Sequence, residues 1–70
     1  MNSITKAIGK RISDLRRQKK LTSEKLAYEA GVSRGYISDI ENGKKLPTVK
    51  FLIKLSKVLE CNLSAFFVGI

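Results

Sequence analysis

A short stretch near the middle of the chain combines an apolar face with a face that can donate and accept hydrogen bonds. If Ile37 points inward, a helical turn of 100° per residue places Ile40 beside it. The residues on the opposite and flanking faces are Arg34, Gly35, Tyr36, Ser38 and Asp39. A helix that is apolar inside and carries these residue types outside, near its N-terminal end, is built like a reader of the DNA major groove.

Gly35 is an unusual choice for an exposed helical position, where glycine costs about 1 kcal/mol relative to alanine. One explanation is that the backbone at this position must lie close to base edges. The other is sequence drift in a helix that is stabilised elsewhere. The sequence leaves both open.

Two capped helices are predicted to position this face. Thr22 and Ser33 are each suited to accept a hydrogen bond from the first turn of a following helix, and Gly31 is suited to end the first of these helices. The residues with helical spacing on the facing sides are Leu26, Ala27, Ala30, Ile37 and Ile40. We therefore expect two helices, over about 22–42, packed against each other across a tight turn.

An amphipathic helix is expected before this pair, from Ser3 to about Lys19, with an apolar stripe formed by Ile4, Ile8, Ile12 and Leu15. Gly9 lies within this helix. It indicates either close packing of another helix or a glycine that is merely tolerated.

Two further helices are expected after the pair. Thr48 is a plausible N-cap for a helix from Val49 to about Leu59, and Asn62 for a short fifth helix. The expected inward residues of the fourth helix are Val49, Leu52, Ile53, Leu55, Ser56 and Leu59. Its lysines, which we expect to form a solvated face, are Lys50, Lys54 and Lys57.

Length and composition exclude several kinds of protein. With 70 residues the chain is expected to form a single domain over residues 1–70. It has one cysteine, Cys61, and no histidine, so neither a disulfide framework nor a Cys/His metal site is expected. We expect no cofactor and no small-molecule ligand. The N-terminus lacks a secretory h-region and no run is long enough to span a bilayer, which predicts a cytoplasmic protein.

The charge is strongly positive, with fourteen Lys and Arg against six acidic residues and a net charge of +8. This favours a polyanionic partner, because phosphate contacts release condensed counterions. Nucleic acid is the obvious candidate. A cationic surface kept for solubility, or an anionic membrane, would also suit the charge.

The sequence resembles the Cro/C1-type helix-turn-helix family, also called XRE-like, over about residues 8–67. The matching motifs, in order, are Leu15-Arg16, Leu21-Thr22, Leu26-Ala27, Gly31-Val32-Ser33, Tyr36-Ile37-Ser38, Ile40-Glu41-Asn42-Gly43, Pro47, and the leucines Leu52, Leu55 and Leu59. The resemblance implies an all-α, compact five-helix bundle of the lambda-repressor-like type. It also implies a bacterial or phage-encoded, nucleoid-associated regulator of transcription; repressor, activator, restriction-modification controller and antitoxin all remain open.

The resemblance also implies roles for individual residues. The expected base-reading set is Arg34, Gly35, Tyr36, Ser38 and Asp39, and the expected phosphate contacts are Thr22, Ser23, Asn42, Lys44, Lys45 and Arg17. Arg34 suits a guanine edge. Asp39 suits a cytosine amino group; alternatively it excludes phosphates, or it orients Arg34 or another basic side chain. Many relatives have glutamine where this chain has Ser23, whose shorter side chain cannot reach as far.

A structural ion pair between Arg16 and Glu41 is implied by the same resemblance. The helical projection agrees, because Glu41 falls on the side of Ile37 rather than on the outer face.

Two other functions compete with regulation by DNA binding. An enzyme is not expected, because the sequence has no histidine, no metal cluster and no glycine-rich phosphate loop. A helical protein-interaction module, such as an antitoxin or anti-repressor partner, is the stronger alternative.

We expect a homodimer on double-stranded DNA with a near-palindromic site, built through the last two helices over about 48–68. The expected dimer contacts are Phe51, Phe66, Phe67, Val68 and Ile70. The alternative is that Phe66 fills the core and the C-terminal tail frays.

Overall fold

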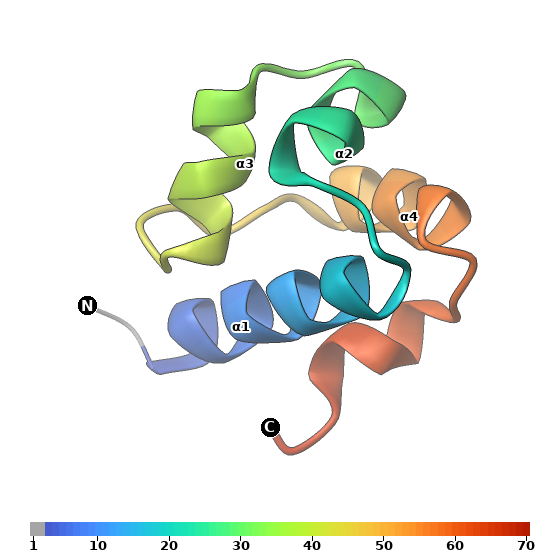
Figure 1. Cartoon of the computed structure of the whole chain (residues 1–70). Coiled ribbons are helices and arrows are strands. Elements are labelled where there is room, and N and C mark those ends of the chain that lie inside the picture. Colours follow the sequence, from blue (N-terminus) through green and yellow to red (C-terminus); the bar gives the residue numbers. More distant parts are fainter. Residues whose placement is uncertain (1–2) are drawn as a thin grey trace.

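The computed structural model describes residues 3–70, which form helices joined by short turns (Figure 1). The elements are α1 (Ser3–Gln18), α2 (Ser23–Ala30), α3 (Arg34–Glu41), α4 (Val49–Val58) and the 3-10 helix η1 (Leu63–Phe67). The all-helical fold is therefore confirmed over these residues. The fifth element differs from the expected α-helix: it is a 3-10 helix of five residues, and the Asn62 side chain forms no capping hydrogen bond at its start.

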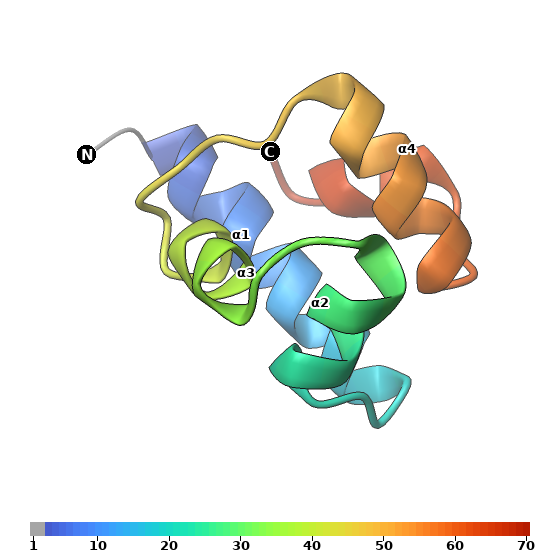
Figure 2. The same ribbon diagram turned by 90° about the horizontal axis from the view of Figure 1, so that it is seen from above.

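Helix α1 packs against α3 and η1, whereas α2 packs against α3 and α4. In Figure 1, α1 runs beneath α2 and α3, and η1 returns to pack beside it. Seen from above, α2 and α3 lie on one side of the molecule and α4 on the other (Figure 2). None of the helices within residues 3–70 has the length and apolar character needed to cross a membrane.

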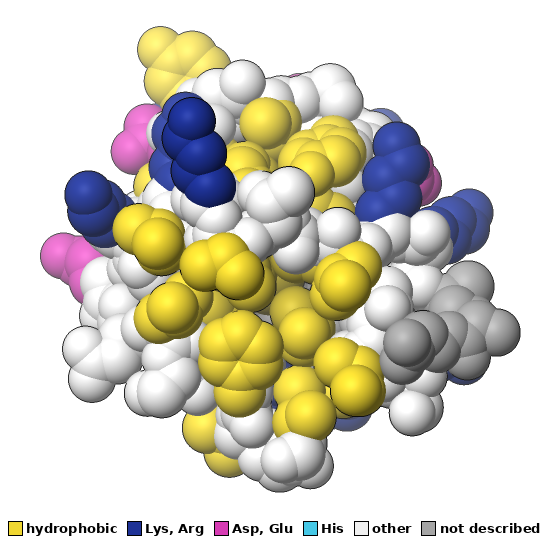
Figure 3. Space-filling model, turned by 180° about the vertical axis from the view of Figure 1, so that it is seen from behind, with side chains coloured by type: hydrophobic (Ala, Val, Ile, Leu, Met, Phe, Trp, Pro, Cys, Tyr) yellow, Lys and Arg dark blue, Asp and Glu magenta, His cyan; other side chains and the backbone are white. Residues whose placement is uncertain are grey.

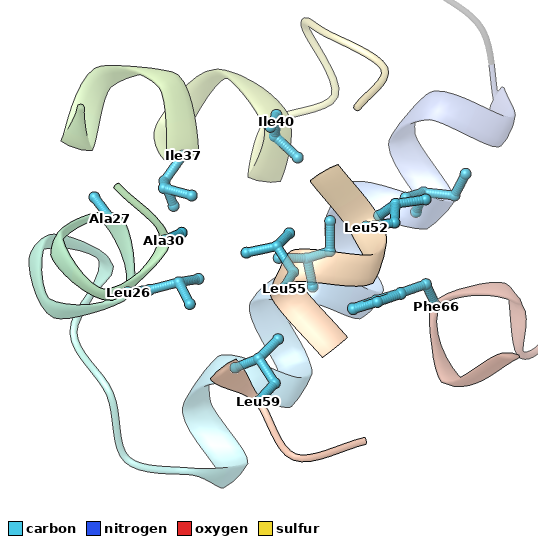
Figure 4. Packing of buried hydrophobic residues seen from close by; sticks show 11 residues of the cluster. Leu26, Ala27, Ala30, Ile37, Ile40, Leu52, Leu55, Leu59 and Phe66 are labelled. Atoms are coloured by element: carbon cyan, nitrogen blue, oxygen red, sulfur yellow. The ribbon is translucent and has the colours of Figure 1, made fainter. Parts of the chain in front are cut away.

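A single hydrophobic cluster joins all five elements (Figure 4). Its members are Ile8, Ile12, Leu26, Ala27, Ala30, Ile37, Ile40, Leu52, Leu55, Leu59 and Phe66. The predicted facing residues of α2 and α3 are all in this cluster, so the contact between these two helices is confirmed. Ile4, expected in the inner stripe of α1, is instead half exposed in the first turn of the helix.

Gly9 marks the closest approach of α1 to α3. A Cβ atom added to Gly9 would lie 2.2 Å from the Ile40 carbonyl oxygen and 3.0 Å from that of Glu41. No side chain fits there. Of the two explanations for this glycine, close packing of another helix is the correct one.

The rotation of α4 differs from the prediction. Leu52, Leu55 and Leu59 face the core, whereas Val49 is 62% exposed and Ile53 43% exposed. Each helical residue turns by about 100°, so Ile53 cannot share the direction of Leu52 once the three leucines define the inner face. The outer surface of α4 therefore includes the apolar residues Val49 and Ile53 beside its exposed lysines, and Figure 3 shows hydrophobic side chains gathered on this side of the molecule.

Candidate nucleic-acid interface

The ends of α2 and α3 have the capping chemistry that the sequence predicts. Thr22 Oγ1 accepts a hydrogen bond from the Lys25 backbone N–H at 3.0 Å. Ser33 Oγ accepts one from the Tyr36 N–H at 3.1 Å. Gly31 ends α2 with a φ of 73°, a left-handed conformation that costs glycine little. These local interactions fix where α2 ends and where α3 starts, and the buried Ile37 and Ile40 determine which face of α3 points outward.

The outer face of α3 presents the predicted polar residues. Arg34, Gly35 and Ser38 are exposed, and Tyr36 and Asp39 are half-buried. Arg34 forms no hydrogen bond or ion pair with any residue in the range 3–70. Its guanidinium is therefore available to bind an external acceptor.

Gly35 lies beside open space. A Cβ atom added there would have only the Ser33 hydroxyl oxygen within 4 Å, at 3.9 Å. Packing within the protein therefore gives no reason for glycine at this position. This contrasts with Gly9, where the neighbouring backbone leaves no room.

Asp39, Lys45 and Tyr36 form one cluster at the edge of α3. The Lys45 ammonium lies 3.8 Å from Asp39 Oδ2 and 5.6 Å from the centre of the Tyr36 ring. Phe51 of α4 packs edge-on against the same ring, with centroids 5.3 Å apart. Of the three roles considered for Asp39, the geometry favours the orientation of a basic side chain, and that side chain is Lys45 rather than Arg34.

Apart from Arg17, the expected phosphate contacts lie at or just beyond the ends of α2 and α3. Asn42 caps α3, and its side-chain amide donates to Ser38 Oγ at 3.2 Å. Lys44 is exposed in the turn that follows. Ser23, in the first turn of α2, is half-buried, and Arg17 is exposed near the end of α1.

The Arg16–Glu41 pair connects the start of α2 to the end of α3. The Arg16 guanidinium donates to both Glu41 carboxylate oxygens, at 2.8 and 3.1 Å, and also to the Leu21 carbonyl at 2.8 Å. Leu21 immediately precedes the N-cap Thr22, and Glu41 immediately precedes Asn42. One side chain thus fixes the start of α2 relative to the end of α3.

Two lysines interpreted from the sequence as a solvated face lie beside the site. Lys50 and Lys54 line a groove next to Ser33 and Tyr36 of the α3 region. Helical spacing within α4 gave no indication of this, because the neighbouring residues come from a different part of the chain. Thr48, the N-cap of α4, lines the same groove.

The residues expected at a dimer contact fall into two groups. Phe67, Val68 and Ile70 are exposed, in keeping with that role. Phe66 is fully buried in the core, and Phe51 packs against Tyr36. We therefore assign Phe66 to the core and Phe51 to the junction of α3 and α4 rather than to a dimer contact.

Comparison with known proteins gives consistent matches. The sequence model of the helix-turn-helix family matches residues 12–66. The chain is 39% identical over 59 residues to the ImmF control region 10 kDa protein of Bacillus phage phi105, covering 84% of this chain and 66% of that protein. It is 43% identical over 54 residues to the transcriptional regulator SinR of Bacillus subtilis, covering 76% of this chain and 49% of SinR. The chain thus spans about half to two thirds of these relatives.

Solved structures of proteins with the same fold also match the chain. The restriction-modification controller protein C.AhdI of Aeromonas hydrophila superposes with a TM-score of 0.90 at 27% identity, covering 94% of this chain and all of that one. A structure of SinR in complex with DNA superposes with a TM-score of 0.80 at 36% identity, covering 86% of this chain and 97% of that one.

Proposed function

The chain belongs to the helix-turn-helix family, and we propose that it is a DNA-binding regulator of transcription that inserts α3 into the major groove. The observation that carries this proposal is the outer face of α3, where Arg34, which has no polar partner among residues 3–70, lies beside a glycine that faces open space. A bidentate guanidinium contact to guanine is among the most specific that a side chain can make. The family and its regulators, the phage protein and SinR among them, support the same function.

Phosphate contacts at the ends of α2 and α3 would set the position of α3 in the groove. Thr22 and Ser23 stand at one end, Asn42 and Lys44 at the other, and the Arg16–Glu41 pair holds the two ends at a fixed separation. Lys45 and Arg17 would add positive charge at the edge of the proposed DNA-binding face. Contacts of this kind determine orientation and affinity, and base contacts determine sequence.

A homodimer would give the specificity that one eight-residue helix lacks, because a two-fold pair reads two half-sites about 34 Å apart. The exposed apolar residues that support a dimer are Leu46, Val49, Ile53, Phe67, Val68 and Ile70. This set keeps three of the residues predicted from the sequence and replaces Phe51 and Phe66 with residues of α4 and the turn before it.

DNA binding measured across a salt series tests the proposal. The expected result is a preference for one near-palindromic site, recovered by selection from random fragments, with affinity that falls steeply with salt. Arg34→Ala should relax base preference at one position, and Lys44→Ala should weaken binding to all sequences alike. Lys57→Ala, an equal change of charge on α4, is the control. Equal affinity for every sequence would contradict specific recognition.

The dimer is tested by sedimentation at micromolar concentration. Ile53→Lys places a charge on the apolar face without touching the core and should give a monomer. Tyr28→Lys, at an exposed position of α2, should leave the dimer intact. A monomeric unmodified protein would contradict the dimer but leave DNA binding by α3 in place.

A further inference from the structure

A groove between the N-terminal ends of α3 and α4 has an apolar lining. Its volume is about 650 Å³, and its apolar walls come from Val32, Tyr36 and Phe51. The rings of Tyr36 and Phe51 meet edge to face. A groove of this size and lining can hold one or two apolar side chains of a partner.

The rim of the groove is positively charged. Lys50 and Lys54 line it, none of the lining residues is acidic, and neither lysine pairs with any residue in the described part of the chain. The N-caps Ser33 and Thr48 line it as well, so the positive ends of two helix dipoles are adjacent. An occupant must therefore be apolar at its centre and acidic at its edges.

The groove also borders the face that we propose to read DNA. Tyr36 belongs to both surfaces, and Lys45 lies over its ring. A ligand seated against Tyr36 would stand where the edge of α3 approaches the duplex. Occupation of the groove and insertion of α3 into the major groove should exclude each other.

We infer that this groove binds an acidic segment of a partner protein, with an apolar side chain packed against the exposed surfaces of the Tyr36 and Phe51 rings and carboxylates beside Lys50 and Lys54. A phosphate chain would pair with the lysines but leave the apolar walls uncovered, which favours a peptide over nucleic acid as the occupant. Binding of such a segment displaces DNA. The displacement of DNA rests on the proposed function, whereas the binding of the acidic segment does not.

Binding is tested first, without DNA, by nuclear magnetic resonance of the ¹⁵N-labelled protein. The probe is a synthetic peptide with a leucine and a phenylalanine between runs of glutamate. A second peptide has serine in place of both apolar residues. The first peptide should shift the amide signals of Val32, Tyr36 and Phe51 and bind about tenfold or more tightly than the second, as expected for burial of an aromatic ring.

Charge variants locate the site. The double variant K50E/K54E should lose most of the affinity for the peptide, whereas Lys57→Glu, on the same helix but outside the groove, should not. Melting temperatures show whether each variant is folded. Equal binding of the two peptides, equal losses in both variants, or shifts confined to other surfaces would overturn the proposal.

Competition then tests displacement. The leucine–phenylalanine peptide should release a labelled DNA duplex at concentrations where the serine peptide does not. Peptide binding that leaves the duplex in place would overturn displacement. A protein that binds the peptide but no DNA would refute the proposed function while the assignment of the groove stands.

Discussion

Arg16 and Glu41 join the two ends of the helix-turn-helix unit through one guanidinium. Two hydrogen bonds run from Arg16 to the Glu41 carboxylate and a third to the Leu21 carbonyl, and the two charged side chains are only 13% and 11% exposed. Planar pairing of this kind adds geometric precision as well as energy. The pair is nearly buried, so any effect it has on the proposed DNA binding should come through the relative position of α2 and α3.

Glu41→Gln should destabilise the protein strongly. The substitution leaves a nearly buried Arg16 without its counter-charge, and breaking such a pair costs about 3 kcal/mol when burial is deep. Thermal or urea unfolding measures the loss. Asp14→Asn is the control, because the Lys10–Asp14 pair is exposed and should contribute less than about 1 kcal/mol. Unchanged melting of Glu41→Gln would show that the pair is not structural.

Gly9→Ala should also destabilise the protein, although alanine is the better helix former. The new methyl group would meet the Ile40 carbonyl oxygen at 2.2 Å, so α1 and α3 must move apart. Overpacking of this kind costs roughly 1–3 kcal/mol, more than the ~1 kcal/mol gained from helix propensity. Urea unfolding gives the net change. A more stable Gly9→Ala protein would mean that the two helices can separate without loss.

Short-range features of the fold could be predicted from the sequence. The caps Thr22, Ser33 and Thr48 and the left-handed Gly31 depend on residues within one turn, and each is found as expected. The outward side of α3 could be projected from Ile37 and Ile40 because only one side of that helix is apolar.

Features that depend on distant contacts could not be predicted. In α4 apolar residues cover more than half of the circumference, so the pattern did not show that Val49 and Ile53 point outward. Phe66 and Phe67 are adjacent and chemically identical, yet only Phe66 is buried. The groove requires Tyr36 and Phe51 to meet, and no local spacing encodes their contact.

Lys20→Gly should stabilise the protein by about 1 kcal/mol. Lys20 has a φ of 58° just beyond α1, a left-handed conformation that costs a side chain roughly this much and glycine little. Its side chain is exposed and forms no hydrogen bond or ion pair with residues 3–70. Lys44→Gly is the control, because it is the same substitution at an exposed residue without positive φ. It should not increase the free energy of unfolding. A less stable Lys20→Gly protein would contradict this account.

Lys19 should control the ionisation of Glu60. The Lys19 ammonium donates a hydrogen bond to the Glu60 carboxylate, and this bond, together with the lysine charge, holds the pKa of Glu60 below its ordinary value. Lys19→Met should therefore raise that pKa in a carboxyl-carbon magnetic resonance titration, and Lys44→Met should not. Because the folded-state pKa is the lower one, the pair stabilises the fold above the unfolded-state pKa. That stability is lost as the pH falls through the folded-state value. If the pKa of Glu60 is the same in the Lys19→Met variant and the unmodified protein, the pair does not form in solution.

Gly35→Ala should affect the stability of the protein and its recognition of DNA in different ways. A Cβ at Gly35 meets only the Ser33 hydroxyl, at 3.9 Å, so the variant should gain up to about 1 kcal/mol of stability from helix propensity, opposite in sign to Gly9→Ala. If glycine is present because base edges approach the backbone, the same variant should bind its preferred DNA site more weakly while its binding to unrelated DNA is unchanged. Urea unfolding and DNA titrations on one protein preparation measure both effects. A more stable variant with unaltered site affinity would show that Gly35 reflects sequence drift, and recognition would then depend on the side chains of α3 rather than on its backbone.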